Sequence, residues 1–131
     1  MSYIRLSGTL ESGPSSGPLS SSFVTSLAFA CERKAFLNAS GVLQRRLESP
    51  NAYVSLSAVG DDADVPTANL LYMKSESEML VRLTLQDGVG GSETVVLPLH
   101  GLLVYETQSE RKITQVEVQG SGLLEYFASG V

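Results

Sequence analysis

Residues 69–128 contain a succession of short runs in which apolar and polar side chains alternate, with turn-forming residues between the runs. From Met79 to Leu85 every second residue is apolar, and the residues between them are Leu80, Arg82 and Thr84. A period of two residues is that of a β-strand with one face in a core and the other in water. The glycine-rich sequence 87–91 is a strong turn signal between this run and the next. The pattern therefore predicts an antiparallel β domain.

Counted over the whole chain, the runs number about nine or ten, which is the pattern of an all-β sandwich or barrel. We therefore predict an all-β fold, either a single antiparallel β-sandwich of the jelly-roll type or a closed barrel of short strands. Pro98 is expected to end one strand, because proline has no N–H for a central ladder. Gly120-Ser-Gly122 is expected to be a tight hairpin between the last two strands. Residues 41–48 fit one helical turn or a strand, and their β-like flanks favour strand or loop.

The chain has 131 residues, which suits one domain. Two Gly-Pro pairs and six serines lie between Glu11 and Ser22, so this stretch supplies no core face. We expect residues 1–22 to form an N-terminal strand on a flexible Ser/Gly/Pro arm, and residues 23–131 to form the β-sandwich domain. Such a strand can pair with a neighbouring subunit, or return to its own sheet through an ordinary surface loop. The residues expected at an interface are Tyr3, Ile4, Arg5, Leu6, Pro14 and Pro18.

The chain has one cysteine, Cys31, so it forms no intramolecular disulfide. Cys31 ends an apolar run that contains Leu27 and Phe29 and follows Phe23. Free cysteine is among the most buried residue types, and we expect Cys31 to be a small buried side chain within a core strand.

The formal net charge is −5, with nine basic and fourteen acidic residues. This balance argues against binding of nucleic acid, which requires a basic surface to neutralise phosphates. Residues 1–5 lack the pattern of a signal peptide, and no apolar run approaches the roughly 20 residues of a membrane span. We therefore expect a protein that folds in a cytoplasm and binds neither membrane nor nucleic acid.

Few residues suit catalysis or metal binding. His100 is the only histidine, so a Ser/His/Asp triad could form only there, and a histidine at a bend between strands is more often structural. Asp61, Asp62 and Asp64 share one loop and could hold calcium, although their spacing does not match an EF-hand and favours a solvated turn. We predict a protein that is not an enzyme and has no catalytic, cofactor-binding or metal-binding residues.

Four segments resemble small β proteins encoded among the structural genes of tailed bacteriophages. They are Leu70-Leu-Tyr-Met-Lys-Ser75, residues 79–84, the bend in residues 96–103, and the closing run in residues 116–130. The resemblance covers the C-terminal half of the chain, and its motifs are mostly turns and core positions. It brings no catalytic residues.

The resemblance implies a structural component of a virion that is assembled in the cytoplasm of the bacterial host. A capsid decoration (cement) protein is favoured. Its expected partners are copies of itself, with a trimer favoured, and the major capsid protein or other virion proteins. The alternatives are a neck, tail or tail-fibre component, or a receptor- or carbohydrate-binding β module that uses the loop at residues 61–64 and exposed tyrosines.

Overall fold

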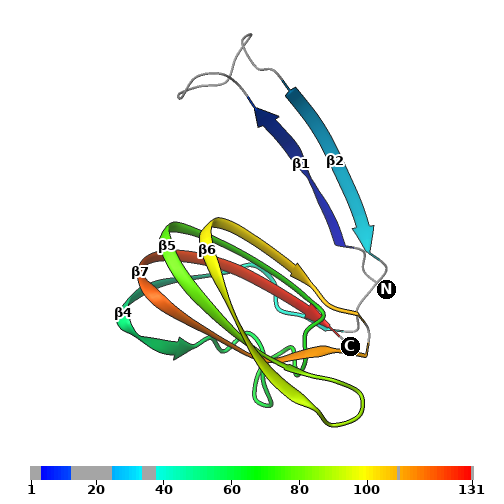
Figure 1. The fold of residues 1–131 in the computed structure, drawn as a ribbon, viewed down its shortest axis with the longest axis vertical. Coiled ribbons are helices and arrows are strands. Elements are labelled where there is room, and N and C mark those ends of the chain that lie inside the picture. Colours follow the sequence, from blue (N-terminus) through cyan, green and yellow to red (C-terminus); the bar gives the residue numbers. More distant parts are fainter. Residues whose placement is uncertain (1–3, 13–24, 34–37, 109, 131) are drawn as a thin grey trace. The chain divides into compact units, whose positions relative to one another are not determined.

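A computed structural model describes residues 4–12, 25–33, 38–108 and 110–130. All the regular elements in these residues are β-strands, as predicted, and every strand pair is antiparallel. The strands are β1 (Ile4–Ser12), β2 (Thr25–Arg33), β3 (Asn38–Ala39), β4 (Leu43–Ser55), β5 (Leu70–Gln86), β6 (Ser92–Glu106) and β7 (Lys112–Gly130) (Figure 1).

The chain divides into two compact units, residues 1–35 and residues 36–131. The first contains a two-stranded sheet of β1 and β2, and the second contains a five-stranded sheet in the order β3-β7-β5-β6, with β4 also paired to β7. This division differs from the expected one, which placed residues 23–131 in one domain. β2 pairs with β1 along its whole length and therefore belongs to the N-terminal unit.

The sheet of the second unit bends over on itself. Within β5, Leu71 and Met73 from one half and Val81 and Leu83 from the other belong to the same buried core. Because these are all odd-numbered positions of one strand, a single face of the sheet surrounds the core from both sides. Figure 1 shows β5, β6 and β7 arching over in this way. The two halves of each long strand thus form two layers around one core.

Irregular backbone positions allow the bend. The register between β5 and β6 shifts between Lys74 and Glu78, and the register between β4 and β7 shifts between Ser49 and Val54. Gly120, in β7, has a φ of 156° and lies against Met79, since a Cβ there would be 2.6 Å from the Met79 Cγ. A residue with a side chain would be both strained and crowded at this point.

The prediction of nine or ten short strands was wrong, because the described residues form seven strands and three of them are long. Pro98 lies within β6 and does not end it. β6 pairs only with β5 in the described part of the chain, and an edge strand tolerates proline because its outer N–H groups need no partner. Gly120-Ser-Gly122 lies within β7 and makes no hairpin, because positive φ at both glycines bends the strand without ending it.

Other expectations about local structure were confirmed. Residues 43–48 are strand, and Asp87–Gly91 is a turn in which the Asp87 carboxylate accepts hydrogen bonds from the Val89 and Gly91 N–H groups. A closed barrel does not form, since β4 and β6 have no pairing with each other in the described residues.

The expectation that Cys31 is buried was wrong, because its side chain is exposed. Leu27 and Phe29 were also expected in a core, and they are 56% and 45% exposed. The physical reason is that β2 has only β1 as a partner in the described residues, so no second layer covers its apolar face. Phe23 lies outside the described residues.

Candidate functional site

The β1–β2 hairpin has one apolar face. Side chains alternate along each strand, and the register pairs Leu6 with Cys31, Gly8 with Phe29 and Leu10 with Leu27. We call this surface the hairpin face, and it consists of Ile4, Leu6, Leu10, Leu27, Phe29 and Cys31.

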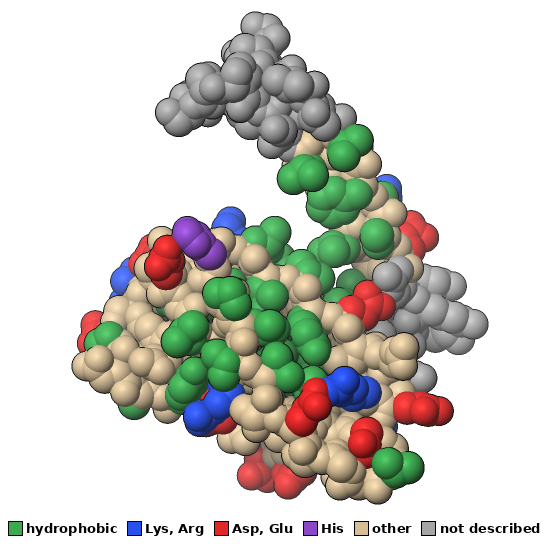
Figure 2. Space-filling model, viewed as in Figure 1, with side chains coloured by type: hydrophobic (Ala, Val, Ile, Leu, Met, Phe, Trp, Pro, Cys, Tyr) green, Lys and Arg blue, Asp and Glu red, His purple; other side chains and the backbone are tan. Residues whose placement is uncertain are grey.

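The shape of the hairpin face depends on Gly8. A Cβ at this position would lie 2.8 Å from the Phe29 Cζ, so the Phe29 ring rests on the glycine of the opposite strand. Leu10 and Leu27 are in register with each other on this face, and they are 61% and 56% exposed. Figure 2 shows hydrophobic side chains along this part of the chain. The face therefore presents a continuous apolar surface to solvent.

The opposite face of the hairpin has a different character. Arg5, Ser7 and Thr9 alternate with the apolar residues of β1, and Arg5 is in register with Glu32 of β2. Ala28 and Ala30 complete this face. The hairpin is thus amphipathic, with charged, polar and small residues on one side and mainly large apolar residues on the other, where Arg33 is in register with Ile4 at the end of the face.

An isolated two-stranded hairpin is marginally stable at best in water, and it needs a third strand or a packed apolar face. Here the described part of the chain provides no third strand, and Leu10, Leu27 and Phe29 of the hairpin face are exposed. Contiguous exposed apolar surface of this kind marks an interaction site. We therefore take the hairpin face as the candidate interface.

A second apolar surface lies on the outer face of β5 and β6. Leu80 is 41% exposed and in register with Pro98, and Val96 is 51% exposed two register pairs further along. We call Leu80, Val96 and Pro98 the sheet patch. Figure 2 shows hydrophobic side chains on the face of the second unit that these strands form.

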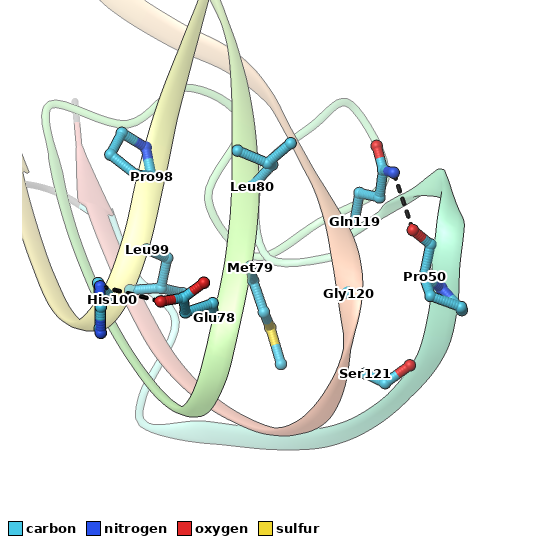
Figure 3. A pocket seen from close by; sticks show the side chains of 10 residues that line it. All are labelled: Pro50, Glu78, Met79, Leu80, Pro98, Leu99, His100, Gln119, Gly120 and Ser121. Carbon is cyan, nitrogen blue, oxygen red and sulfur yellow. Dashed lines mark hydrogen bonds and ion pairs between the residues drawn. The ribbon is translucent and has the colours of Figure 1, made fainter.

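A shallow hollow of about 490 Å³ adjoins the sheet patch (Figure 3). The Gln119 side-chain amide spans one side of it and donates a hydrogen bond of 2.9 Å to the Pro50 carbonyl oxygen. The hollow is lined by Pro50, Glu78, Met79, Leu80, Pro98, Leu99, His100, Gln119, Gly120 and Ser121. Most of the lining is apolar, and its polar side chains are those of Glu78, His100, Gln119 and Ser121.

His100 lies at the margin of the hollow and its Nδ1 is 3.4 Å from the Glu78 Oε1. Both side chains are more than three-quarters exposed, so water screens the pair and it contributes little to stability. In Figure 3, Ser121 lies on the far side of the hollow from His100. The arrangement therefore places a histidine and a carboxylate together on one side of the hollow and a serine on the other.

The charged groups beside the sheet patch are paired. Arg82 donates two hydrogen bonds to the Glu117 carboxylate, of 3.1 and 2.8 Å, and its guanidinium lies 4.0 Å from the centre of the Tyr53 ring. The hydrogen bonds that Arg82 donates to Glu117 raise the pKa of Arg82, so this side chain is charged at every ordinary pH. A partner that packs on the sheet patch meets an arginine whose charge is already compensated.

Of the predicted interface residues, Ile4 and Leu6 lie on the hairpin face, and Arg5 lies on the opposite face. Tyr3, Pro14 and Pro18 are outside the described residues. Sequence reasoning missed Leu10, Leu27 and Phe29 as exposed residues. The signal was present, because residues 27–31 alternate with the same period as residues 4–10, but alternation alone does not say which strand pairs with which.

The loop proposed for calcium does not gather its carboxylates. Asp61, Asp62 and Asp64 are on a turn closed by backbone hydrogen bonds from Gly60 and Ala63. Within the described residues, no group of three or more histidine, cysteine or acidic side chains is placed to hold a metal ion.

In the part of the chain that the structure describes, no helix has the length and apolar character to cross a membrane. Comparison with protein-family models, with curated proteins and with solved structures finds no match to this chain.

Proposed function

We propose that this protein is a non-enzymatic structural component of a tailed-phage virion, and that it acts as a capsid decoration protein. It binds the capsid lattice and further copies of itself. In this proposal the folded sheet of residues 36–131 is a β-sandwich body, and the β1–β2 hairpin is the arm that joins subunits.

The observation that carries the proposal is the hairpin face. A hairpin whose large apolar side chains are exposed needs a partner surface, and a subunit of a particle is surrounded by such surfaces. The resemblance of residues 70–130 to phage structural proteins supports the same class. The shallow hollow supports it indirectly, since its histidine and carboxylate lie on the opposite side of the hollow from its serine.

The test is incorporation into particles. Phage particles are purified from cells that express a tagged copy of this protein, and the particles are assayed for the tag and for resistance to heat. We expect the tag to co-purify with heads, in a fixed ratio to the major capsid protein, and we expect particles that lack the protein to lose DNA at a lower temperature.

Labelling of tails alone would replace the decoration role with a neck or tail role. A protein that never joins particles would overturn the proposal. The control is the Val89→Asp variant, which alters a fully exposed turn outside both apolar surfaces and leaves incorporation unchanged.

A further inference from the structure

We propose that the hairpin face of one copy packs on the sheet patch of a second copy, with the Phe29 ring at the hollow beside Leu80 and Pro98. This inference rests on the proposed assembly function and names the surfaces through which copies join. The contact is heterologous, because each copy gives its hairpin face and offers its sheet patch.

The first argument is that a single contact covers both surfaces. The hairpin face and the sheet patch are two separate exposed apolar surfaces of one chain, on β1–β2 and on β5–β6. A hairpin face packed on another hairpin face would leave the sheet patch in water. Packing of the hairpin face on the sheet patch removes both from water and gives the hairpin the second layer that it lacks.

The second argument is electrostatic. None of the six residues of the hairpin face is charged. At the sheet patch, Arg82 is already held by Glu117 and Tyr53. The contact therefore leaves the charge of Arg82 paired. The other charged residues near it are Arg33, in register with Ile4 at the end of the hairpin, and Glu78, which lines the hollow 3.4 Å from His100.

The third argument concerns the aromatic anchor. Aromatic side chains that enter a pocket at the centre of an interface carry much of its binding energy. Phe29 is the one aromatic residue of the hairpin face, and it is 45% exposed although its ring rests on Gly8. The hollow adjoins the sheet patch and is lined by Pro50, Met79 and Gly120 on its apolar side. The ring of Phe29 and most of the lining of the hollow are thus both apolar.

The fourth argument is size. A nine-residue strand is about 30 Å long, so a face two strands wide covers about 300 Å². When each copy gives one hairpin and receives another, its two contacts bury about 1,200 Å² in total, the lower end of the range for stable interfaces. One contact alone falls below this range, which favours assemblies in which every copy both gives and receives a hairpin.

Cys31 makes the proposal directly testable, since it is exposed, is the only cysteine, and lies on the hairpin face. The wild-type chain is mixed with a full-length chain that carries Cys31→Ser and Val96→Cys, distinguished by a tag. The mixture is treated with a short bismaleimide. Only a contact between different copies can join these two cysteines.

We expect a linked pair of one wild-type and one variant chain, in a yield several times that of the matched control. The control carries Cys31→Ser and Val89→Cys, which places an even more exposed cysteine on the turn between β5 and β6, away from the patch. Equal yields for the two variants would overturn the proposal. So would a product that consists only of two wild-type chains, because that indicates hairpin packed on hairpin.

A third variant distinguishes a contact between two copies from a contact within one copy. The wild-type chain with Val96→Cys added contains both cysteines, and a cross-link found only within one chain would also overturn the proposal. Particle incorporation of unlinked protein is scored in parallel. If the protein joins particles but the Val96→Cys link fails, the docking surfaces are wrong and the assembly function stands. If it joins no particles, the function itself fails.

Discussion

Leu83 illustrates how single residues hold the folded sheet together. It lies in β5 with no exposed surface and belongs to the core that both halves of the sheet share. We expect Leu83→Ala to lower the free energy of unfolding by about 2–5 kcal/mol, because the substitution removes buried methyl groups and leaves a cavity between the layers. Urea unfolding followed by circular dichroism measures this loss. Val89→Ala, at a residue that is 94% exposed, serves as the control and changes the stability by less than about 0.5 kcal/mol.

Gly120 is the residue at which the bend of β7 is most sensitive to a side chain. Its φ of 156° and the nearness of the Met79 side chain both oppose any other residue. We expect Gly120→Ala to cost about 1–3 kcal/mol, from backbone strain and overpacking together. The matched control is Gly88→Ala, where the nearest atom to an added Cβ is 3.8 Å away. If the two variants melt at the same temperature, the bend does not depend on Gly120.

Tyr72 couples the stability of the sheet to pH. Burial, the charge of Glu125 and a hydrogen bond of 3.3 Å from the Tyr72 hydroxyl to the Glu125 carboxylate raise its pKa above the ordinary value of 10.0. Below that value the tyrosine is protonated in the folded and unfolded chains alike, and its contribution to stability is complete. As the pH rises above it, the unfolded chain releases the proton first, so stability is lost until the pH passes the folded pKa.

We therefore expect stability to fall more steeply above pH 10 in the wild type than in Tyr72→Phe. Urea midpoints measured for both proteins through this range test the expectation, because the difference between them removes the contributions of the other tyrosines. Parallel curves for the two proteins would show that Tyr72 does not bind its proton more tightly in the folded state.

At the scale of elements, the hairpin is separable from the sheet. β1 and β2 pair only with each other in the described residues, so a change on the hairpin face leaves the core of residues 36–131 intact. We expect Phe29→Asp to abolish association between copies, since it places a charge in an apolar contact. The unfolding transition of the sheet should stay within about 0.5 kcal/mol of the wild type. Sedimentation velocity and urea unfolding give the two readouts.

The control for this prediction is Ser7→Asp, which places the same residue on the opposite face of the hairpin, in register with Ala30. If association is lost equally in both aspartate variants, the cause is unfolding of the hairpin and not a charge in the hairpin face.

The sequence predicted the elements better than their boundaries. Alternation found the strands around residues 4–10 and 79–86, because a period of two residues is set by local backbone geometry. It failed at Pro98 and Gly120, where the same residue types that end strands elsewhere are placed at an edge or at a bend. A proline interrupts a strand only where a backbone N–H at its position would have to donate a hydrogen bond to a neighbouring strand. Whether such a strand is present depends on the tertiary fold.

The candidate interface was foreseen in part for a related reason. Ile4 and Leu6 were expected at an interface, whereas Phe29 and Cys31 were expected in a core. Apolar alternation reports that a face needs to be covered, and it does not report whether the cover comes from the same chain. The pairing of β1 with β2, with no third strand in the described residues, supplied the missing information.

At the scale of the whole molecule, exchange of hairpins makes the assembly depend on concentration and on closure. A heterologous contact gives a closed ring when the rotation between copies closes, and an open filament otherwise. We expect light scattering during size-exclusion chromatography to show a discrete oligomer, with the trimer favoured, which dissociates on dilution. A mass that stays that of one chain at all concentrations would contradict self-assembly in solution.

The position of β7 has a consequence for synthesis of the protein. This strand occupies residues 112–130, yet it pairs with β3, β4 and β5 and lies at the centre of the sheet. While the ribosome still holds those residues, the earlier strands have nothing to join them, and the core cannot close. Folding of the second unit therefore waits until residues 112–130 have left the ribosomal tunnel. We expect a nascent chain cut short before β7 to stay unfolded and open to proteases.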